Sequence, residues 1–82
     1  MWYVYIIKSQ LKKWYYVGST NRLDIRLKEH NNGQVTSTKL YLPFNMVYKK
    51  KFDSEMLARE YERLIKDKRI LKESLIKDIE SS

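Results

Sequence analysis

The side chains able to do chemistry in this chain are few, and they restrict the reactions it can perform. The sequence has no cysteine and one histidine, His30, so a cysteine–histidine nucleophilic pair is impossible. No serine stands in a Gly-x-Ser-x-Gly turn, and two glycines, Gly18 and Gly33, are too few for a glycine-rich phosphate-binding loop. The remaining tyrosines, arginines and carboxylates suit the positioning and charge neutralisation of a phosphate ester, with a metal ion held by one carboxylate and water.

The tyrosines concentrate in two neighbouring segments, "YVYIIKS" and "WYYVGST", with only "QLKK" between them. Each segment alternates aromatic or β-branched residues with smaller or polar ones, which is typical of strands. Because consecutive strands joined by a short turn usually pair, Met1–Lys8 and Trp14–Ser19 are predicted to form an antiparallel hairpin. Such a hairpin could project the hydroxyls of Tyr5 and Tyr16 from one face. Gly18 would let a backbone or ligand approach closely beside Tyr16.

The middle of the chain is predicted to hold a helix, a loop and a third strand. Asn21 or Thr20 is the expected N-cap of the helix, and the Asn31-Asn32-Gly33 sequence is its expected end. Gln34–Leu42 is polar and is predicted to be a loop. Phe44–Phe52 alternates loosely and is predicted to be a strand.

Two more helices are predicted in the C-terminal part. Asp53 or Ser54 is expected to cap the first of them, with Glu55 in its first turn, where the helix dipole favours a negative charge. A second amphipathic segment runs from Arg69 to Ile79, and the Ser81-Ser82 end is expected to fray.

The predicted order of elements is therefore β-β-α-β-α-α, in one domain over residues 1–82. The predicted fold class is α/β, more narrowly α+β: a small three-stranded antiparallel sheet flanked by helices. Three strands cannot enclose a core alone, so helices are expected to cover at least one face of the sheet.

The charge of the chain points to a polyanionic partner. Lys plus Arg is 17 against 10 for Asp plus Glu, a formal net charge of +7. Such an excess attracts nucleic acid, and the alternative is a solvated basic surface without a partner. No helix joins a lysine-rich face to a strongly apolar one, which argues against a membrane surface. No apolar run is long enough for a signal peptide or a membrane span, so an intracellular, cytoplasmic protein is expected.

Four ordered features resemble the GIY-YIG nuclease family. The chain has "YVY" where the family has Gly-Ile-Tyr, and "YVG" where it has Tyr-Ile-Gly. "NRLDIRLKEHNNG" is similar to the Arg-Leu-x-x-His-Asn segment of the family, and "SEMLAREYERLIK" to its Ala-x-x-x-Glu helix. The likeness covers nearly the whole chain and is greatest to small stand-alone members. The first motif has Tyr3 in place of glycine, and the chain lacks the extra DNA-binding domain of larger members, which leaves the choice of target open.

The resemblance implies a metal-dependent endonuclease that hydrolyses phosphodiester bonds in nucleic acid, with DNA favoured and DNA repair as a natural role. Tyr5 would help to activate a water molecule, and Tyr16 would orient the water or the phosphate. Arg26, with His30 one helical turn later, would neutralise charge on the phosphate. Glu62 would be the single protein ligand of a magnesium ion, or of another divalent cation such as manganese.

Alternatives stay open for several of these residues. Glu60 is the second candidate for the metal ligand, although Glu62 has the better spacing from the helix alanine. His30 is expected to hydrogen-bond either a tyrosine or phosphate, or else a carbonyl at the helix end. Arg22 and Lys39 are secondary candidates for contacts to nucleic acid, with solvated side chains as the alternative.

Two other functions compete with the enzyme. One is a catalytically silent, basic nucleic-acid-binding module of the same fold. The other is a subunit whose protein partner supplies the target. The residues do not distinguish DNA from RNA, and cleavage that depends on magnesium would separate the enzyme from the module.

Overall fold

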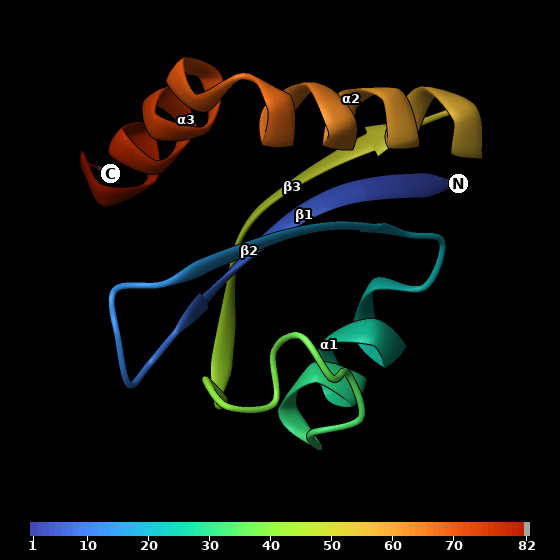
Figure 1. Ribbon diagram of the computed structural model, residues 1–82. Coiled ribbons are helices and arrows are strands. Elements are labelled where there is room, and N and C mark those ends of the chain that lie inside the picture. Colours follow the sequence, from blue (N-terminus) through green and yellow to red (C-terminus); the bar gives the residue numbers. More distant parts are fainter. Residues whose placement is uncertain (82) are drawn as a thin grey trace.

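The computed structural model describes residues 1–81. Its elements are β1 (Trp2–Ser9), β2 (Tyr15–Thr20), α1 (Leu23–Asn31), β3 (Phe44–Phe52), α2 (Glu55–Asp67) and α3 (Arg69–Ser81) (Figure 1). This order and the α+β class agree with the prediction from sequence. Ser81 is the last residue of α3, whereas Ser82, the other residue expected to fray, lies outside the described residues.

The three strands form one antiparallel sheet in the order β2-β1-β3. The predicted hairpin is confirmed, and β1 pairs with β2 so that Tyr5 faces Gly18 and Ile7 faces Tyr16. The central position of β1 explains its continuous apolar run, because a strand covered on both faces has no polar side. Each residue from Val4 to Ile7 is at most 1% exposed.

Alternation along β1 supplies two hydrophobic layers. Val4 and Ile6 pack with Ala58 and Ile65 of α2, on the face that α3 also covers. Tyr5 and Ile7 point the other way and pack with residues of α1, the following loop and β3. Figure 1 shows this arrangement, with α2 and α3 on one side of the sheet and α1 on the other.

The helix starts differ in how far the sequence predicted them. Ser54 caps α2 as expected, because its side chain accepts a hydrogen bond from the backbone N–H of Leu57. The predicted cap of α1 is wrong, since Arg22 is the N-cap residue and makes no side-chain cap. β2 extends to Thr20, and the hydroxyl of Thr20 accepts the backbone N–H of Arg22 at 3.0 Å, so this threonine closes the turn between strand and helix.

The end of α1 and the following loop prepare one wall of the site. Asn32 is the C-cap residue, and Gly33 follows with a positive φ of 76°, as the predicted helix end requires. The loop over residues 34–42 is not uniformly solvated, because Thr38 is fully buried within it. Among residues 1–81, no helix is both long enough and apolar enough to cross a lipid bilayer.

Candidate active site

The glycine of β2 determines where the phenol of Tyr5 lies. A Cβ built on Gly18 would lie 2.5 Å from the Tyr5 hydroxyl oxygen and 2.6 Å from its ring Cζ. The missing side chain therefore lets the buried ring of Tyr5 lie across β2, which is an outer strand of the sheet. The close approach expected near Gly18 is thus made by the side chain of Tyr5.

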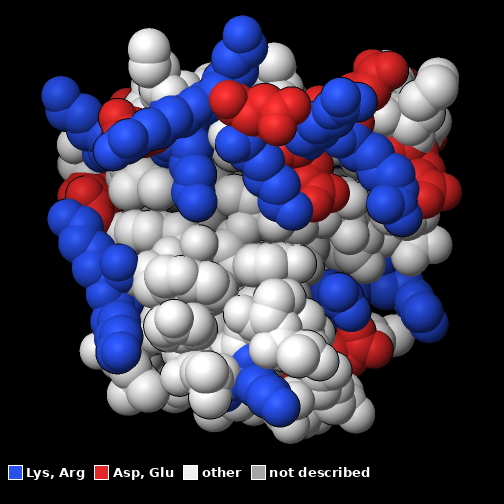
Figure 2. All heavy atoms as spheres, in the orientation of Figure 1, with Lys and Arg blue, Asp and Glu red and all other residues white. Residues whose placement is uncertain are grey.

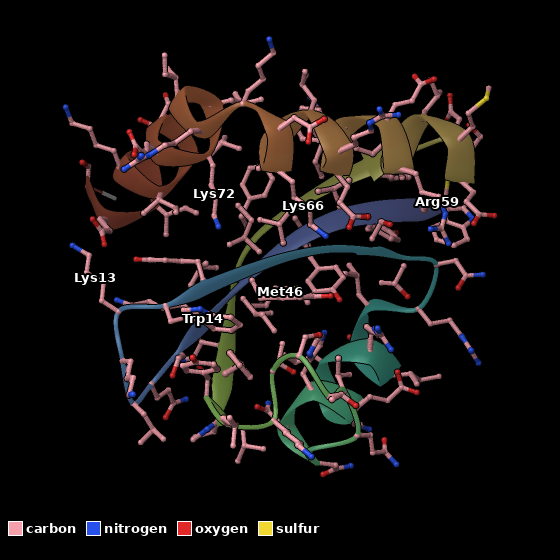
Figure 3. The ribbon with its side chains drawn as sticks, in the orientation of Figure 1. Lys13, Trp14, Met46, Arg59, Lys66 and Lys72 are labelled. Carbon is pink, nitrogen blue, oxygen red and sulfur yellow. The ribbon has the colours of Figure 1, made fainter. Side chains whose placement is uncertain are left out.

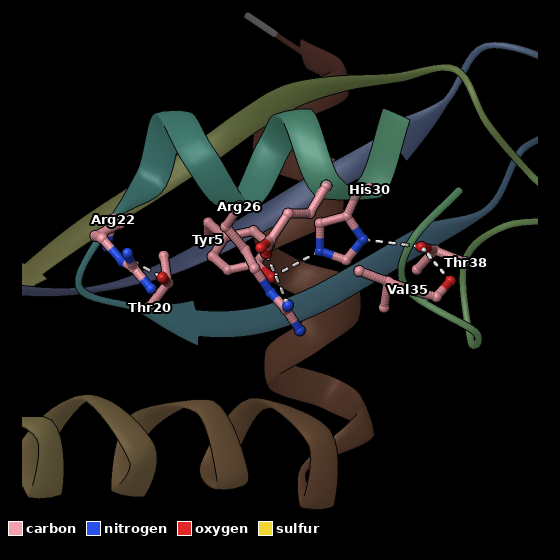
Figure 4. A network of polar contacts seen from close by, with 8 residues as sticks. Tyr5, Thr20, Arg22, Arg26, His30, Val35 and Thr38 are labelled. Atoms are coloured by element: carbon pink, nitrogen blue, oxygen red, sulfur yellow. Dashed lines mark hydrogen bonds and ion pairs between the residues drawn. The ribbon is translucent and has the colours of Figure 1, made fainter. Parts of the chain in front are cut away.

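A chain of hydrogen bonds runs from Tyr5 into the loop after α1 (Figure 4). The Tyr5 hydroxyl lies 2.8 Å from Nε2 of His30, and Nδ1 of His30 lies 2.8 Å from Oγ1 of Thr38. Thr38 in turn donates to the backbone carbonyl of Val35 at 3.3 Å. Of the alternatives for His30, the structure therefore has the hydrogen bond to a tyrosine.

The last acceptor fixes the direction of this chain. A carbonyl oxygen only accepts, so the Thr38 hydroxyl donates to Val35 and accepts from an Nδ1–H of His30. Nε2 is then unprotonated and accepts a hydrogen bond from the hydroxyl of Tyr5. Burial, helped by the charge of Arg26, lowers the pKa of His30 to about 4, which agrees with a neutral ring. The imidazole is thus arranged as a proton acceptor for the phenol.

Tyr5 itself is a neutral phenol at neutral pH. Burial is the main cause that raises its pKa to about 12, and the nearby Tyr16 and Glu62 raise it further. Arg26 opposes this rise. The rings of Tyr5 and Tyr16 have their centroids 6.5 Å apart on the same face of the hairpin, as the strand pattern predicts.

Arg26 reaches the phenol from α1. Figure 4 shows its side chain beside Tyr5, and Nη1 of Arg26 lies 3.1 Å from Oε1 of Glu29. Partial burial lowers the pKa of Arg26, but hydrogen bonding to Glu29 and Tyr5 outweighs that effect and the net shift is upward. The guanidinium is therefore charged at neutral pH, and because the side chain is 37% exposed it is accessible to a ligand.

The carboxylate of Glu62 comes to the same strand from the opposite face of the sheet. Its Oε1 accepts from the hydroxyl of Ser19 at 2.5 Å, and its Oε2 lies 2.7 Å from Nζ of Lys66. The side chain is only 18% exposed, and Nζ of Lys66 lies 5.6 Å from the ring centroid of Tyr16. The candidate site therefore straddles the outer strand β2, with α1 on one side and α2 on the other.

The remaining predicted residues lie outside this cluster or at its margin. Glu60 is exposed on α2, and Lys39 is exposed in the loop after α1. Arg22 is exposed next to the site, where it lines a pocket of about 300 Å³ together with Arg26 and Arg59. The contact of Glu62 with Ser19 of β2 thus favours Glu62 over the exposed Glu60.

The donor set fits a magnesium ion held by one protein ligand. Within the described part of the chain, no group of three or more histidine, cysteine or acidic side chains could hold a metal ion. Glu62 offers hard carboxylate oxygens, and its charge is near enough to Tyr5 to help raise the pKa of that phenol. Magnesium commonly binds through one or two carboxylates, phosphate oxygens and water. A cation at Glu62 would replace the positive charge that Lys66 now supplies.

Sequence reasoning missed the roles of Thr38 and Ser19, and it missed where Lys66 lies relative to Tyr16. Thr38 gave no signal, because it stands in a polar loop that would ordinarily be solvated. The contact of Ser19 with Glu62 joins elements far apart in the chain and needs the tertiary structure. The spacing of Lys66 and Glu62 along the helix predicts that they pair. It does not predict that Lys66 lies over the ring of Tyr16.

A tyrosine-bearing hairpin, an arginine helix and a glutamate helix around a three-stranded sheet define a small α+β domain with the features of the GIY-YIG fold. The family model described as the GIY-YIG catalytic domain matches residues 1–72, and the chain belongs to the GIY-YIG family. The resemblance of the motifs is thereby confirmed at the level of the family.

Relatives of similar size support the assignment. The chain is 41% identical over 63 residues to the UPF0213 protein SSP2268 of Staphylococcus saprophyticus, in an alignment that covers 73% of this chain and 76% of that protein. It is also similar to the solution NMR structure of the UPF0213 protein BH0048 from Bacillus halodurans, with a TM-score of 0.57 and 32% identity. That match covers 94% of this chain and 84% of the other.

Proposed function

We propose that this protein is a metal-dependent endonuclease that hydrolyses phosphodiester bonds in nucleic acid, DNA before RNA, and that residues 1–82 form one nuclease domain. The observation that carries the proposal is the hydrogen bond between the Tyr5 hydroxyl and His30. The Tyr5 end of this bond lies across β2 from the carboxylate of Glu62. A candidate proton acceptor and a candidate metal-binding carboxylate thus lie on either side of the outer strand β2.

In the proposed reaction, a water molecule attacks phosphorus in line with the leaving oxygen. The new oxygen–phosphorus bond forms while the bond to the leaving oxygen breaks. The Tyr5 oxygen takes the proton of the water as its own hydroxyl proton passes to Nε2 of His30. This transfer avoids a free phenolate, which a phenol with a pKa of about 12 would resist forming.

The charges around Tyr5 suit this proton transfer. The pKa of His30 is about 4 in the free protein because the ring is buried near Arg26. A bound phosphate adds negative charge, which pairs with Arg26 and raises the pKa of His30. The guanidinium fork of Arg26 can then hold two phosphate oxygens as charge gathers on them, and Tyr16 orients the phosphate or the water.

When bound at Glu62, a divalent cation supplies positive charge at the phosphate and at the leaving oxygen. Ser19 orients the carboxylate through its hydrogen bond to Oε1. Lys66 neutralises the same carboxylate in the free protein through its contact with Oε2. This contact would have to break for Oε2 to bind a cation.

The test is cleavage of labelled single-stranded, branched and duplex DNA, and of matching RNA, with magnesium, with manganese and with EDTA. Cleavage should require the metal, and Glu62→Gln or Tyr5→Phe should reduce it by about 100-fold or more. Glu60→Gln is the matched control on the same helix and should keep full activity.

A second candidate is a catalytically silent binding module. It is favoured by one observation, namely that both carboxylate oxygens of Glu62 already have protein partners. Binding that survives Glu62→Gln and Tyr5→Phe, with no cleavage of any substrate by the unaltered protein, would replace the nuclease proposal with this one.

A further inference from the structure

A row of aromatic rings leads away from the candidate site along β2. The ring centroids of Tyr16 and Trp14 are 6.3 Å apart, with their planes inclined by 28°. Trp14 then stacks on Tyr41 of the loop after α1, with centroids 4.1 Å apart and planes only 11° from parallel. All three side chains are partly exposed, so the row is a surface feature as well as a packing one.

Positive charge accompanies this row. Nζ of Lys12 lies 5.7 Å from the ring centroid of Tyr41, at the hairpin end of the row. Figure 3 shows Lys66 and Lys72 extending toward β2 from α2 and α3, on the other side of the strand from Trp14. Among the described residues, neither Lys12 nor Lys72 has an ion-pair partner, so both charges are free to meet an anion.

The surface around the row has a matching pattern. Figure 2 shows an uncharged band across the face that carries β2, with lysine and arginine side chains, interspersed with acidic ones, above it over α2 and α3 and beside it at the hairpin end. An uncharged strip edged by cations suits a strand of nucleic acid, which is apolar on the faces of its bases and anionic along its backbone.

We propose that Trp14 and Tyr41 form a stacking platform for an unpaired nucleobase, so that the bound nucleic acid is single-stranded on the Trp14 side of the scissile phosphate. Bases stack readily on flat aromatic side chains whatever their sequence. In a duplex both faces of every internal base are covered by its neighbours, so an unpaired base can use the platform and an internal paired base cannot. This inference rests on the proposed function for the position of the scissile phosphate, and it names the substrate class.

Intrinsic fluorescence can report on the platform directly. The chain has two tryptophans, so Trp2→Phe leaves Trp14 as the sole reporter. A single-stranded oligonucleotide of about ten nucleotides, within the usual span of such sites, is titrated in EDTA so that no metal-dependent cleavage occurs. The fluorescence of Trp14 should be quenched by the single strand and not by a blunt duplex of the same sequence.

Substitutions separate stacking from folding. Trp14→Leu and Tyr41→Leu in the otherwise unaltered chain should weaken single-strand binding about tenfold, whereas Trp14→Phe should keep most of it. Tyr61→Leu is the matched control, because Nζ of Lys50 lies 4.8 Å from the Tyr61 ring centroid in a similar lysine–tyrosine pair on the other face of the sheet. The Tyr61→Leu variant should bind the single strand as the unaltered protein does, and its circular dichroism spectrum should be native.

The outcomes also separate this inference from the nuclease proposal. Cleavage of nucleic acid without single-strand-specific quenching, or quenching equal for strand and duplex, overturns the platform and leaves the nuclease intact. Single-strand-specific quenching without cleavage under any metal overturns the nuclease and keeps the platform. Equal binding by Trp14→Leu and Trp14→Phe also overturns the platform.

Discussion

Adding one methyl group to Gly18 tests how tightly the phenol of Tyr5 is held. The new Cβ would lie 2.5 Å from the Tyr5 hydroxyl oxygen, and the ring cannot easily move because it is buried and hydrogen-bonded to His30. Gly18→Ala should therefore lower the free energy of unfolding by about 1–3 kcal/mol, the usual cost of overpacking. It should also abolish cleavage, measured beside urea denaturation. A variant with native stability and native activity would show that Tyr5 is not confined by this glycine.

The buried histidine gives stability a specific dependence on pH. The pKa of His30 is about 4 in the folded protein and about 6.5 in an unfolded chain, so the unfolded state binds more protons between these values. Stability should be complete above pH 6.5 and fall as the pH drops toward 4, by about 3 kcal/mol at most.

Denaturation curves between these pH values measure that dependence. His30 is the only histidine in the sequence. The change in stability in the upper part of this pH range, where carboxylates do not yet titrate, is therefore due to His30. His30→Gln should remove the slope there, whatever its own cost in stability. An unchanged slope in that variant would contradict the assignment.

At the level of elements, the loop after α1 acts through one buried hydroxyl. Thr38→Val keeps the shape of the side chain but leaves the Nδ1–H of His30 without an acceptor, which should cost about 1–3 kcal/mol. The other tautomer then becomes favourable, and Nε2 would no longer accept from Tyr5, so cleavage should fall as well. Thr38→Ser keeps the hydroxyl and is the matched control. Equal cleavage rates for the two variants would show that the loop does not orient the imidazole.

The sequence predicts the elements of this protein well because each follows from a local pattern. The alternation of β1 and β2 and the Ser54 cap of α2 are read from neighbouring residues. The predicted N-cap of α1 is wrong because β2 continues to Thr20. How far a strand extends depends on its pairing with another part of the chain. Local propensity carries no information on that pairing.

The candidate site was predictable in its residue types and not in its contacts. The motifs single out Tyr5, Tyr16, Arg26 and Glu62, and the structure gathers them around β2. Their mutual distances depend on the sheet order, which places β2 at an outer position between α1 and α2. The direction of the hydrogen bonds through His30 required the position of Thr38, which only the folded loop provides.

At the scale of the whole molecule, the net charge of +7 should make binding to nucleic acid strongly dependent on salt. Each phosphate that the protein neutralises contributes a slope of about −0.7 to −0.9 in a plot of log affinity against log salt concentration. Affinity for a single strand should fall at least about tenfold between about 50 and 200 mM salt. Fluorescence anisotropy at several salt concentrations measures the slope. A slope near zero would mean that the basic surface does not contact phosphates.

The position of β1 between two hydrophobic layers has a consequence for how the protein melts. Val4 and Ile6 belong to one layer, and Tyr5 and Ile7 to the other, so neither half of the molecule can stay folded once this strand detaches. Heating should therefore produce a single cooperative transition, without a partly folded species that keeps one layer. The contact between the phenol and its histidine partner would be lost in that same step, so the proposed activity would disappear together with the global unfolding and not before it.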